Sequence, residues 1–235
     1  MDVLMMLCDG SLLKRVGNQN GFDILDMGIT KYDDALKIQL DILNDRICGK
    51  ASDTIIFTEH YPSLVLGRTS AESSIRSLEY FKNKKVPVIK TTRGGDITYH
   101  SPGQLVIYPV IDLSVRGKNI SLYLDLLEKA AVNVLSGFGI PAERTEGKRG
   151  VWVKKKKVAF SGISLKKWIT SHGMIVNINN DVVPFSYIDP CGQKDITVTS
   201  AKEFLGRDLD MNRVKKAFIK ELTNVFAVRD QRGKS

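Results

Sequence analysis

Apolar residues recur at helical spacing in three segments of the chain. In residues 31–47 most of them fall on one broad face, which predicts an amphipathic helix. A second helix is predicted over residues 121–135, where Gly137 and Gly139 follow as C-terminal stop signals. A third is predicted over residues 212–226, and Ser200 with Glu203 forms a capping-box pattern before a short helix.

Between these helices, apolar residues gather in short runs rich in β-branched and aromatic side chains, which is typical of strands. The runs cover residues 54–58, 86–89, 105–111, 151–153, 158–163 and 174–178. Pro87 and Pro109 lie inside two of them and predict edge strands or bends, because proline cannot donate to a strand ladder. This mixed order favours an α/β or α+β layer architecture with a mixed sheet, rather than a doubly wound parallel sheet.

Length and composition indicate one globular domain over residues 1–235. The chain has 43% hydrophobic and 26% charged residues, which excludes disorder, and it contains no repeat or flexible linker. The longest apolar run near the start, residues 3–8, is too short to span a bilayer and has no basic leader before it. We therefore expect neither a membrane-bound nor a secreted protein.

Cysteine usage points to a reducing compartment. Cys8, Cys48 and Cys191 are odd in number, widely spaced and without a CxxC pair, so neither a disulfide framework nor a zinc site is predicted. We expect a cytoplasmic protein with no bound metal and no cofactor.

The chain is basic, with 35 Lys and Arg against 26 Asp and Glu and a net charge of +9. This balance fits an acidic partner, which could be nucleic acid, an anionic surface or an acidic protein, although the charge could also serve solubility alone. A nucleic-acid-binding module is disfavoured because no recognition motif is present and aromatic residues make up only 8%.

A glycine-rich stretch, residues 91–104, could bind a ligand. Gly94 and Gly95 would allow close approach to the main chain, and Arg93 beside them could hold an anion or a carbonyl group. The stretch is not a phosphate-binding P-loop, because it lacks GxxxxGK[ST].

Two further residues could carry chemistry. Cys191 lies between Pro190 and Gly192 in a polar loop, where a thiol can act as a nucleophile if its pKa is lowered, although buried structural cysteines are common. The lysine run 154–157 predicts a solvated hairpin turn, except that Lys157 opens an apolar strand and could be drawn into a site as the cationic partner of a thiolate. The three histidines, His60, His100 and His172, could each be structural or functional.

Taken together, several segments resemble the lipoyl(octanoyl) transferase family. They are HYP with LGR (60–62 and 66–68), RGGDITYHSPGQLVIYPVIDL (93–113), GVWV, KVAFSGI, SHGMIVNIN, and PCG followed by VTSA, in the family's order over residues 30–205. The resemblance implies a fold akin to biotin and lipoate protein ligases and to the catalytic core of class II aminoacyl-tRNA synthetases.

The resemblance also implies roles for residues. The cysteine of PCG, Cys191, would carry the acyl group, and Lys157 would lower the pKa of its thiol. The acyl pocket would be lined by Arg93, Gly94, Gly95, Asp96, Ile97, Thr98, Tyr99, His100, Phe160, Ser161, Gly162, Gly173, Met174 and Ile175.

The implied reaction moves an octanoyl group from acyl carrier protein to a lysine of a lipoyl domain. The acceptors would be lipoyl domains of 2-oxoacid dehydrogenase E2 subunits and the glycine cleavage H protein. Two rivals share parts of this pattern: an ATP-dependent lipoate or biotin ligase, which needs no nucleophilic cysteine, and an amidotransferase that relays lipoyl groups between proteins. Cys191 argues against the first, and the choice of donor separates the second.

Overall fold

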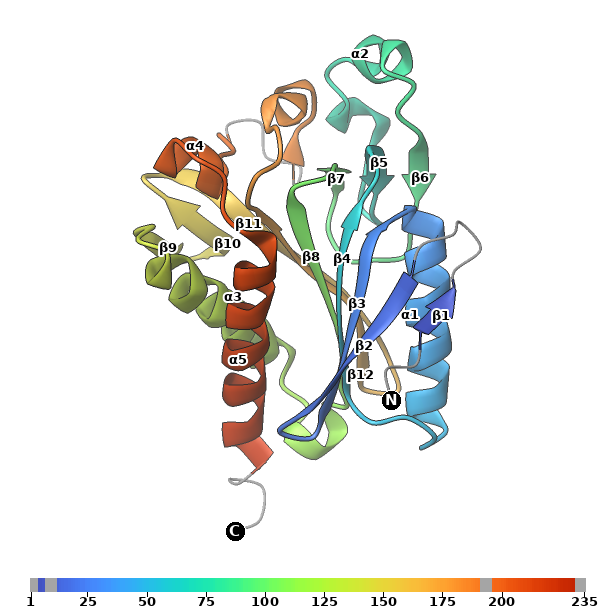
Figure 1. The fold of residues 1–235 in the computed structure, drawn as a ribbon. Helices are drawn as coiled ribbons and strands as arrows, with labels where there is room; N and C mark the ends of the chain where they lie inside the picture. Colours follow the sequence, from blue (N-terminus) through green and yellow to red (C-terminus); the bar gives the residue numbers. More distant parts are fainter. Residues whose placement is uncertain (1–3, 7–11, 191–195, 231–235) are drawn as a thin grey trace.

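The computed structural model describes residues 4–6, 12–190 and 196–230, so Cys8 and Cys191 lie outside the described residues. A nine-stranded mixed sheet forms the centre, in the order β1-β2-β3-β4-β8-β12-β11-β10-β9 (Figure 1). Its strands are β1 (Leu4–Met6), β2 (Leu12–Gln19), β3 (Phe22–Thr30), β4 (Thr54–His60), β8 (Gln104–Val110), β9 (Ala142–Thr145), β10 (Lys148–Val153), β11 (Lys156–Lys166) and β12 (Ile169–Asn177). Only the β3–β4 pairing in this sheet is parallel, which confirms the expected mixed architecture.

A second, smaller sheet continues one end of the fold. It pairs β6 (Val88–Lys90), β5 (Ser63–Leu66) and β7 (Ile97–His100) in that order. The glycine-rich stretch, residues 91–104, therefore contains β7 of the small sheet and leads into β8 of the large sheet. Helix α2 (Leu78–Asn83) caps this region, with the Ser77 hydroxyl accepting from the Tyr80 backbone N–H at 3.3 Å.

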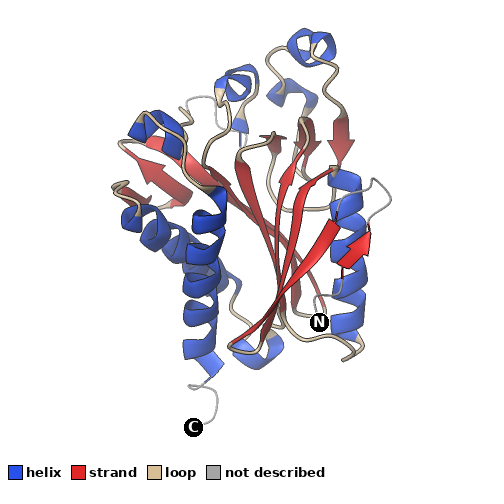
Figure 2. Cartoon of the chain, in the orientation of Figure 1, coloured by secondary structure: helices blue, strands red, loops and turns tan. Residues whose placement is uncertain are grey.

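Helices cover both faces of the large sheet (Figures 1 and 2). Helices α3 (Ile120–Gly137) and α5 (Met211–Asp230) pack on one face and bury Leu127, Val134 and Phe218 in its core. Helix α1 (Tyr32–Ile47) covers the other face, where Ala35 and Leu43 join a second core with residues of the small sheet. The three predicted long helices are confirmed, because each has one apolar face to bury.

Short helical segments complete the chain: η1 (Glu72–Ser74), η2 (Ser114–Arg116), η3 (Val183–Tyr187) and α4 (Ala201–Leu205). The predicted cap of α4 is present, since the Ser200 hydroxyl accepts from the Glu203 backbone N–H at 3.2 Å. The Glu203 carboxylate accepts from the Thr199 hydroxyl at 2.8 Å.

Of the two expectations for Pro109, an edge strand is wrong, because β8 lies between β4 and β12 in the middle of the sheet. The carbonyl of Pro109 points towards β12, where it accepts from the Thr170 hydroxyl at 2.7 Å. The regular β8–β12 pairing ends before that point, at Ile107 and Met174. Pro109 therefore lies beyond the last regular β8–β12 pair, where its lack of a backbone N–H removes no hydrogen bond of that ladder.

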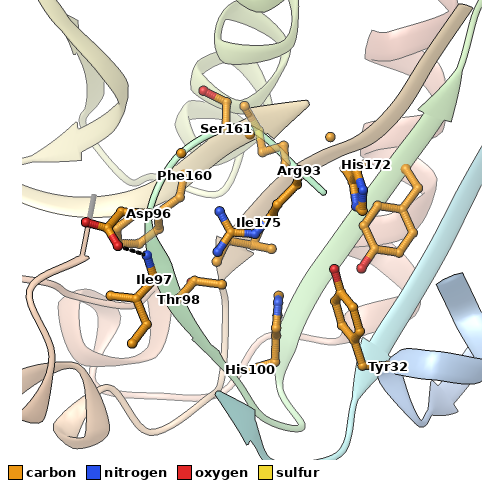
Figure 3. Close-up of a pocket in the computed structure, with 15 residues that line it drawn as sticks. Tyr32, Arg93, Asp96, Ile97, Thr98, His100, Phe160, Ser161, His172 and Ile175 are labelled. Atoms are coloured by element: carbon orange, nitrogen blue, oxygen red, sulfur yellow. Dashed lines mark hydrogen bonds between the residues drawn. The ribbon is translucent and has the colours of Figure 1, made fainter. Parts of the chain in front are cut away.

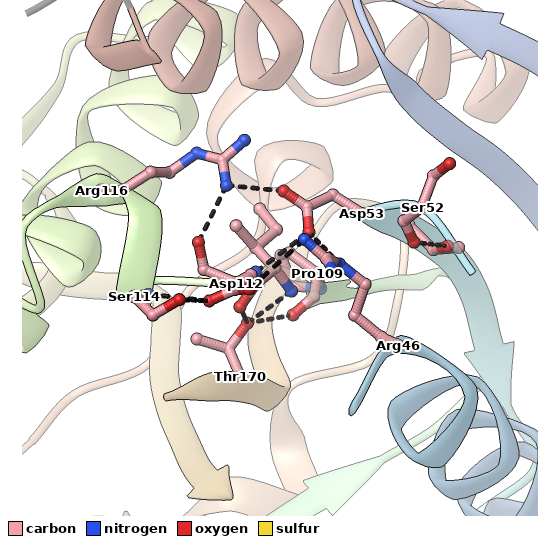
Figure 4. Close-up of polar contacts among 10 residues, drawn as sticks. Arg46, Ser52, Asp53, Pro109, Asp112, Ser114, Arg116 and Thr170 are labelled. Carbon is pink, nitrogen blue, oxygen red and sulfur yellow. Dashed lines mark hydrogen bonds and ion pairs between the residues drawn. The ribbon is translucent and has the colours of Figure 1, made fainter. Parts of the chain in front are cut away.

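An ion-pair cluster ties together the loops at the end of the sheet remote from the small sheet (Figure 4). Asp53 is 6% exposed and pairs with Arg46 at 2.8 Å and Arg116 at 2.6 Å. It also accepts from the Asp112 backbone N–H at 3.0 Å. The cluster joins α1, the start of β4 and the segment after β8, so it fixes the sheet ends rather than a reactive site.

Candidate functional site

A pocket of about 510 Å³, partly open to solvent, lies between the small sheet, β11, β12 and the start of α1 (Figure 3). The lining residues are Tyr32, Arg93, Gly95, Asp96, Ile97, Thr98, His100, Tyr108, Phe160, Ser161, Gly162, His172, Gly173, Met174 and Ile175. The set contains every residue named above for the acyl pocket except Gly94 and Tyr99.

Two contacts explain these exceptions. Tyr99 alternates with Thr98 and His100 along β7 and packs its ring against Phe81 and Phe185 instead. Gly94 donates its backbone N–H to the Ile163 carbonyl oxygen at 2.9 Å, and a Cβ on Gly94 would lie 2.9 Å from that carbonyl oxygen. Gly94 thus holds the glycine-rich stretch against β11.

Arg93 is fixed by backbone carbonyl groups on the pocket wall. Its Nη2 donates to the carbonyl of Val65 at 2.9 Å, and its Nη1 donates to that of Gly94 at 3.2 Å. The guanidinium therefore places a positive charge in the wall, and this charge helps to lower the pKa of His172. Such a fixed cation suits a polar head group or a developing negative charge.

Lys157 differs from the other three lysines of its run, as predicted. Residues 154–156 are exposed, and Lys154 and Lys155 have positive φ angles of 47° and 66°, as in a two-residue type I′ hairpin turn. Lys157 is 4% exposed, and its Nζ lies 5.3 Å from the Trp152 ring centroid and 4.8 Å from that of Phe160. The ammonium group is thus held between aromatic faces at the pocket.

A β-bulge brings Lys157 to the pocket side of the sheet. Residues three apart on a regular strand point to opposite faces. Between β10 and β11 the register shifts, so that Trp152 pairs with Lys157 whereas Val151 pairs with Ala159. Val158 and Ala159 both enter the core beneath α3, so Lys157 and Phe160 share the other face. Re-aiming a side chain next to a site is a common role of bulges.

Glu128 of α3 braces the wall behind Lys157. Its side chain is 1% exposed and accepts from the Gly150 backbone N–H at 2.7 Å and from the Ser161 hydroxyl at 3.1 Å. A Cβ on Gly150 would lie 2.4 Å from Cε and 3.2 Å from Nζ of Lys157. Neither Glu128 nor Gly150 was identified from the sequence, because their proximity to Lys157 depends on packing α3 against β10 and β11.

The three histidines meet in one buried cluster with two tyrosines. The His60 ring lies 5.1 Å from that of His100 and 5.3 Å from that of Tyr32, and His172 packs on Tyr108 at 6.3 Å. His60 Nε2 accepts from the Tyr108 hydroxyl at 2.8 Å, because Nδ1 donates to the Thr30 carbonyl at 3.3 Å. His100 Nδ1 donates to the Gln104 side-chain oxygen at 2.7 Å.

Burial favours the neutral form of all three histidines and outweighs the opposing effect of the hydrogen bonds from His60 to Thr30 and from His100 to Gln104. Burial lowers the pKa of His60 to about 4, and burial together with Arg93 lowers that of His172 to about 4. Burial, followed by the neighbouring His60, lowers the pKa of His100 well below its usual range. The chain spacing of the histidines gave no sign of the cluster, because β4, β7 and β12 bring them together only in the folded sheet.

Cys191 lies outside the described residues, and the chain on both sides of that segment is anchored. Before it, Asp189 donates its backbone N–H to Ser74 at 2.8 Å. After it, the Thr197 carbonyl accepts from the Lys157 N–H at 2.8 Å, and the Thr199 N–H donates to the Lys157 carbonyl at 3.0 Å. Residues 197–199 therefore run directly beside Lys157.

Within residues 4–6, 12–190 and 196–230, the His, Cys, Asp and Glu side chains form no group of three suited to a metal ion. Over the same part of the chain, none of the helices combines the length and apolarity needed to cross a membrane.

Residues 31–223 match the model of the lipoyl protein ligase A/B catalytic domain. An octanoyltransferase of Caldicellulosiruptor saccharolyticus is 39% identical over 204 residues, which cover 86% of this chain and 87% of the relative. An octanoyltransferase of Desulfovibrio desulfuricans is 38% identical over 203 residues, which cover 86% and 85%.

Solved structures of ligases share the fold. A crystal structure of lipoate-protein ligase A bound with ATP superposes with a TM-score of 0.66 at 15% identity and covers 89% of this chain and 86% of the ligase. A bipartite lipoate protein ligase from Thermoplasma acidophilum, described with its E2 lipoyl domain, gives 0.61 at 17% identity, covering 81% and 79%. Biotin protein ligase from Aquifex aeolicus in complex with biotin and ATP gives 0.55 at 16% identity, covering 89% and 72%.

Proposed function

Because the chain belongs to the lipoyl protein ligase A/B catalytic-domain family, we propose that it is an octanoyltransferase acting in protein lipoylation. It would take the octanoyl group from octanoyl-acyl carrier protein and attach it to a lysine of a lipoyl domain. The acceptors would be the lipoyl domains of 2-oxoacid dehydrogenase E2 subunits and the glycine cleavage H protein.

The proposed chemistry has two steps. The Cys191 thiolate attacks the carrier thioester, so a new thioester forms on Cys191 and the carrier leaves as a thiolate, which takes up a proton from water. The neutral ε-amine of the acceptor lysine then attacks the Cys191 thioester, which forms the amide, breaks the C–S bond to release the Cys191 thiolate and frees one proton. The first step exchanges one thioester for another, and the second is downhill, so neither requires a nucleotide.

Lys157 supports this scheme as the cation beside the nucleophile. An ammonium group at contact distance lowers the pKa of a thiol from about 8.5 towards neutral pH. Lys157 is 4% exposed. Its backbone N–H and carbonyl both form hydrogen bonds with described residues that follow Cys191, namely Thr197 and Thr199. After acylation, the Lys157 amine is positioned to accept the proton of the attacking lysine.

The pocket beside Lys157 suits the octanoyl chain. Ile97, Phe160, Met174 and Ile175 supply apolar surface, and Gly162 and Gly173 form part of the wall. A Cβ on Gly173 would meet the Ile107 carbonyl at 2.2 Å, so no other residue fits there. The single observation that carries the proposal is the burial of Lys157 against Phe160, a residue of the pocket wall.

Exposed lysines near the pocket suit an acidic carrier or lipoyl domain. Arg144 and Arg149 are already paired with Asp125, whereas residues 154–156 are exposed beside Lys157. We therefore place the docking contacts mainly on the three hairpin lysines, and transfer should slow as salt rises. A reducing compartment such as the cytoplasm would keep Cys191 as a thiol.

The test is intact-mass analysis of the protein mixed with octanoyl-acyl carrier protein, without ATP. Wild type should gain one octanoyl group, whereas Cys191→Ala should gain none and Cys48→Ala should behave as wild type. Lys157→Ala should keep the thiol but shift its alkylation profile to higher pH. Acylation only with ATP and free octanoic acid would show a ligase instead, and acylation by an octanoylated lipoyl domain but not by the carrier would show a relay amidotransferase.

A further inference from the structure

His172 has an unusual backbone conformation for a residue inside a strand. Its φ is +56°, in the left-handed region that side chains other than glycine seldom adopt. Its N–H leaves the strand ladder and donates to the side-chain oxygen of Gln39, which is fully buried in α1, at 2.8 Å. Backbone strain of this kind persists only where surrounding contacts maintain it, and it is common at functional sites.

The strained backbone carries the His172 ring into the end of the pocket remote from Lys157. In the β11–β12 ladder Phe160 pairs with Ile175, and three residues further on Ile163 pairs with His172. Three residues of strand span about 10 Å. Figure 3 shows Phe160 and Asp96 on one side of the pocket and His172 with Tyr32 on the other.

Neutral polar side chains close the pocket at this end. Tyr32, His100 and Tyr108 line it together with His172. The Tyr32 hydroxyl is buried without a hydrogen bond to the described residues, although the Thr91 hydroxyl lies near enough to influence the Tyr32 pKa. A hydrocarbon chain pressed against such groups would displace water without replacing its hydrogen bonds, which is unfavourable.

We propose that His172 is a specificity-determining residue whose ring ends the acyl pocket and limits the acyl chain to about eight carbons. The inference rests on the proposed function, because the reacting sulfur must lie near Lys157. Lys157 Nζ is 4.8 Å from the Phe160 ring centroid, which puts the reacting end beside Phe160, and about 10 Å of strand separates Phe160 from the pairing position of His172. An extended octanoyl chain has seven bonds, each advancing roughly 1.25 Å, and so reaches about 9 Å. Two more methylenes would require the space that the imidazole ring occupies.

The test is a competition among octanoyl, decanoyl and dodecanoyl carrier proteins, read by intact mass as the acyl groups on the enzyme. His172→Gly removes the ring and suits a positive φ. Because each buried methylene changes binding about fourfold, the decanoyl to octanoyl ratio should rise about fifteenfold. Lys167→Gly is the matched control, since Lys167 is exposed, has a φ of +50° in the β11–β12 turn and lies outside the pocket lining.

An unchanged ratio in His172→Gly overturns the inference, whereas wild type that takes no acyl group from any carrier overturns the proposed function instead. A second measurement does not depend on that variant or on the chemistry. The Tm of Cys191→Ala is measured with free fatty acids of six to fourteen carbons. Stabilisation should rise to eight carbons and then fall, and a continued rise to twelve would show that no end stop exists.

Discussion

Gly150→Ala would test directly whether the position of Lys157 controls the thiol. The added Cβ would lie 2.4 Å from Cε of Lys157 and 2.5 Å from the Ala159 carbonyl oxygen, so the lysine side chain and the β10–β11 pair must both shift. Gly150 also has a φ of +104°, which is unfavourable for alanine. Gly147→Ala is a close control, because Gly147 lies near the start of the same strand with a φ of +70° and has open space at its Cβ position.

The two variants should differ in stability by a measurable amount. Gly147→Ala carries only the cost of a left-handed alanine, about 1–2 kcal/mol. Gly150→Ala adds about 1–3 kcal/mol of overpacking to about 1–3 kcal/mol of backbone strain, so we expect a loss of about 2–6 kcal/mol. Urea unfolding would measure both.

Activity separates the contact with Lys157 from general destabilisation. If Lys157 lowers the thiol pKa by one unit or more, displacing it should reduce the thiolate fraction at pH 7, and with it the rate of acylation by the octanoyl carrier, about eightfold or more. The rate should recover towards pH 9, where the thiol ionises unaided, and Gly147→Ala should acylate like wild type. Equal acylation rates in folded Gly150→Ala and Gly147→Ala at pH 7 would refute this view of Lys157.

Three further predictions concern stability, each measured by urea unfolding. Glu128→Leu leaves the buried Gly150 N–H and the Ser161 hydroxyl without an acceptor and should lower the free energy of unfolding by about 2–6 kcal/mol. Glu128→Gln keeps an acceptor oxygen and should cost less, so equal losses in the two variants would contradict this reasoning. Asp53→Ala leaves two largely buried arginines without their shared carboxylate and should cost about 3 kcal/mol, and a loss below about 1 kcal/mol would show that the cluster is dispensable. The pKa values of about 4 for His60 and His172 lie below the unfolded value near 6.5. The stability that these histidines contribute should therefore be fully present above pH 6.5 and should fall by up to about 1.4 kcal/mol per pH unit for each histidine down to pH 4. A free energy of unfolding that stays constant from pH 7 to pH 5 would rule this out.

The sequence predicted those parts of the fold that local patterns determine. Helices α1, α3 and α5 each show one apolar face, and β4 is a continuous apolar and β-branched run, so all four were found near their true bounds. The strands β2 and β3 were missed, because polar residues interrupt their alternation and β2 lies near the sheet edge with Val16 exposed. Strand β6 begins at Val88, two residues later than predicted, because Pro87 ends the preceding turn.

For the candidate site, local context was enough to distinguish Lys157 from its neighbours. The apolar strand after it indicated a side chain drawn inwards, and the structure confirms its burial. Tyr32 and Tyr108 gave no such signal, because each reaches the pocket only through packing of α1 and β8 against β12. The carry-over of roles to Cys191 and the pocket residues depends on the resemblance and stays a prediction.

The two-residue turn before Lys157 ties loop length to chemistry. Surface hairpin turns usually accept insertions and deletions freely during evolution. Here a one-residue change would shift the pairing of Trp152 with Lys157 and send the next side chain to the opposite face of the sheet. The same change of register would break the hydrogen bonds of Thr197 and Thr199 with the Lys157 backbone. Relatives that keep this arrangement should therefore vary the identity of residues 154–156 much more readily than their number.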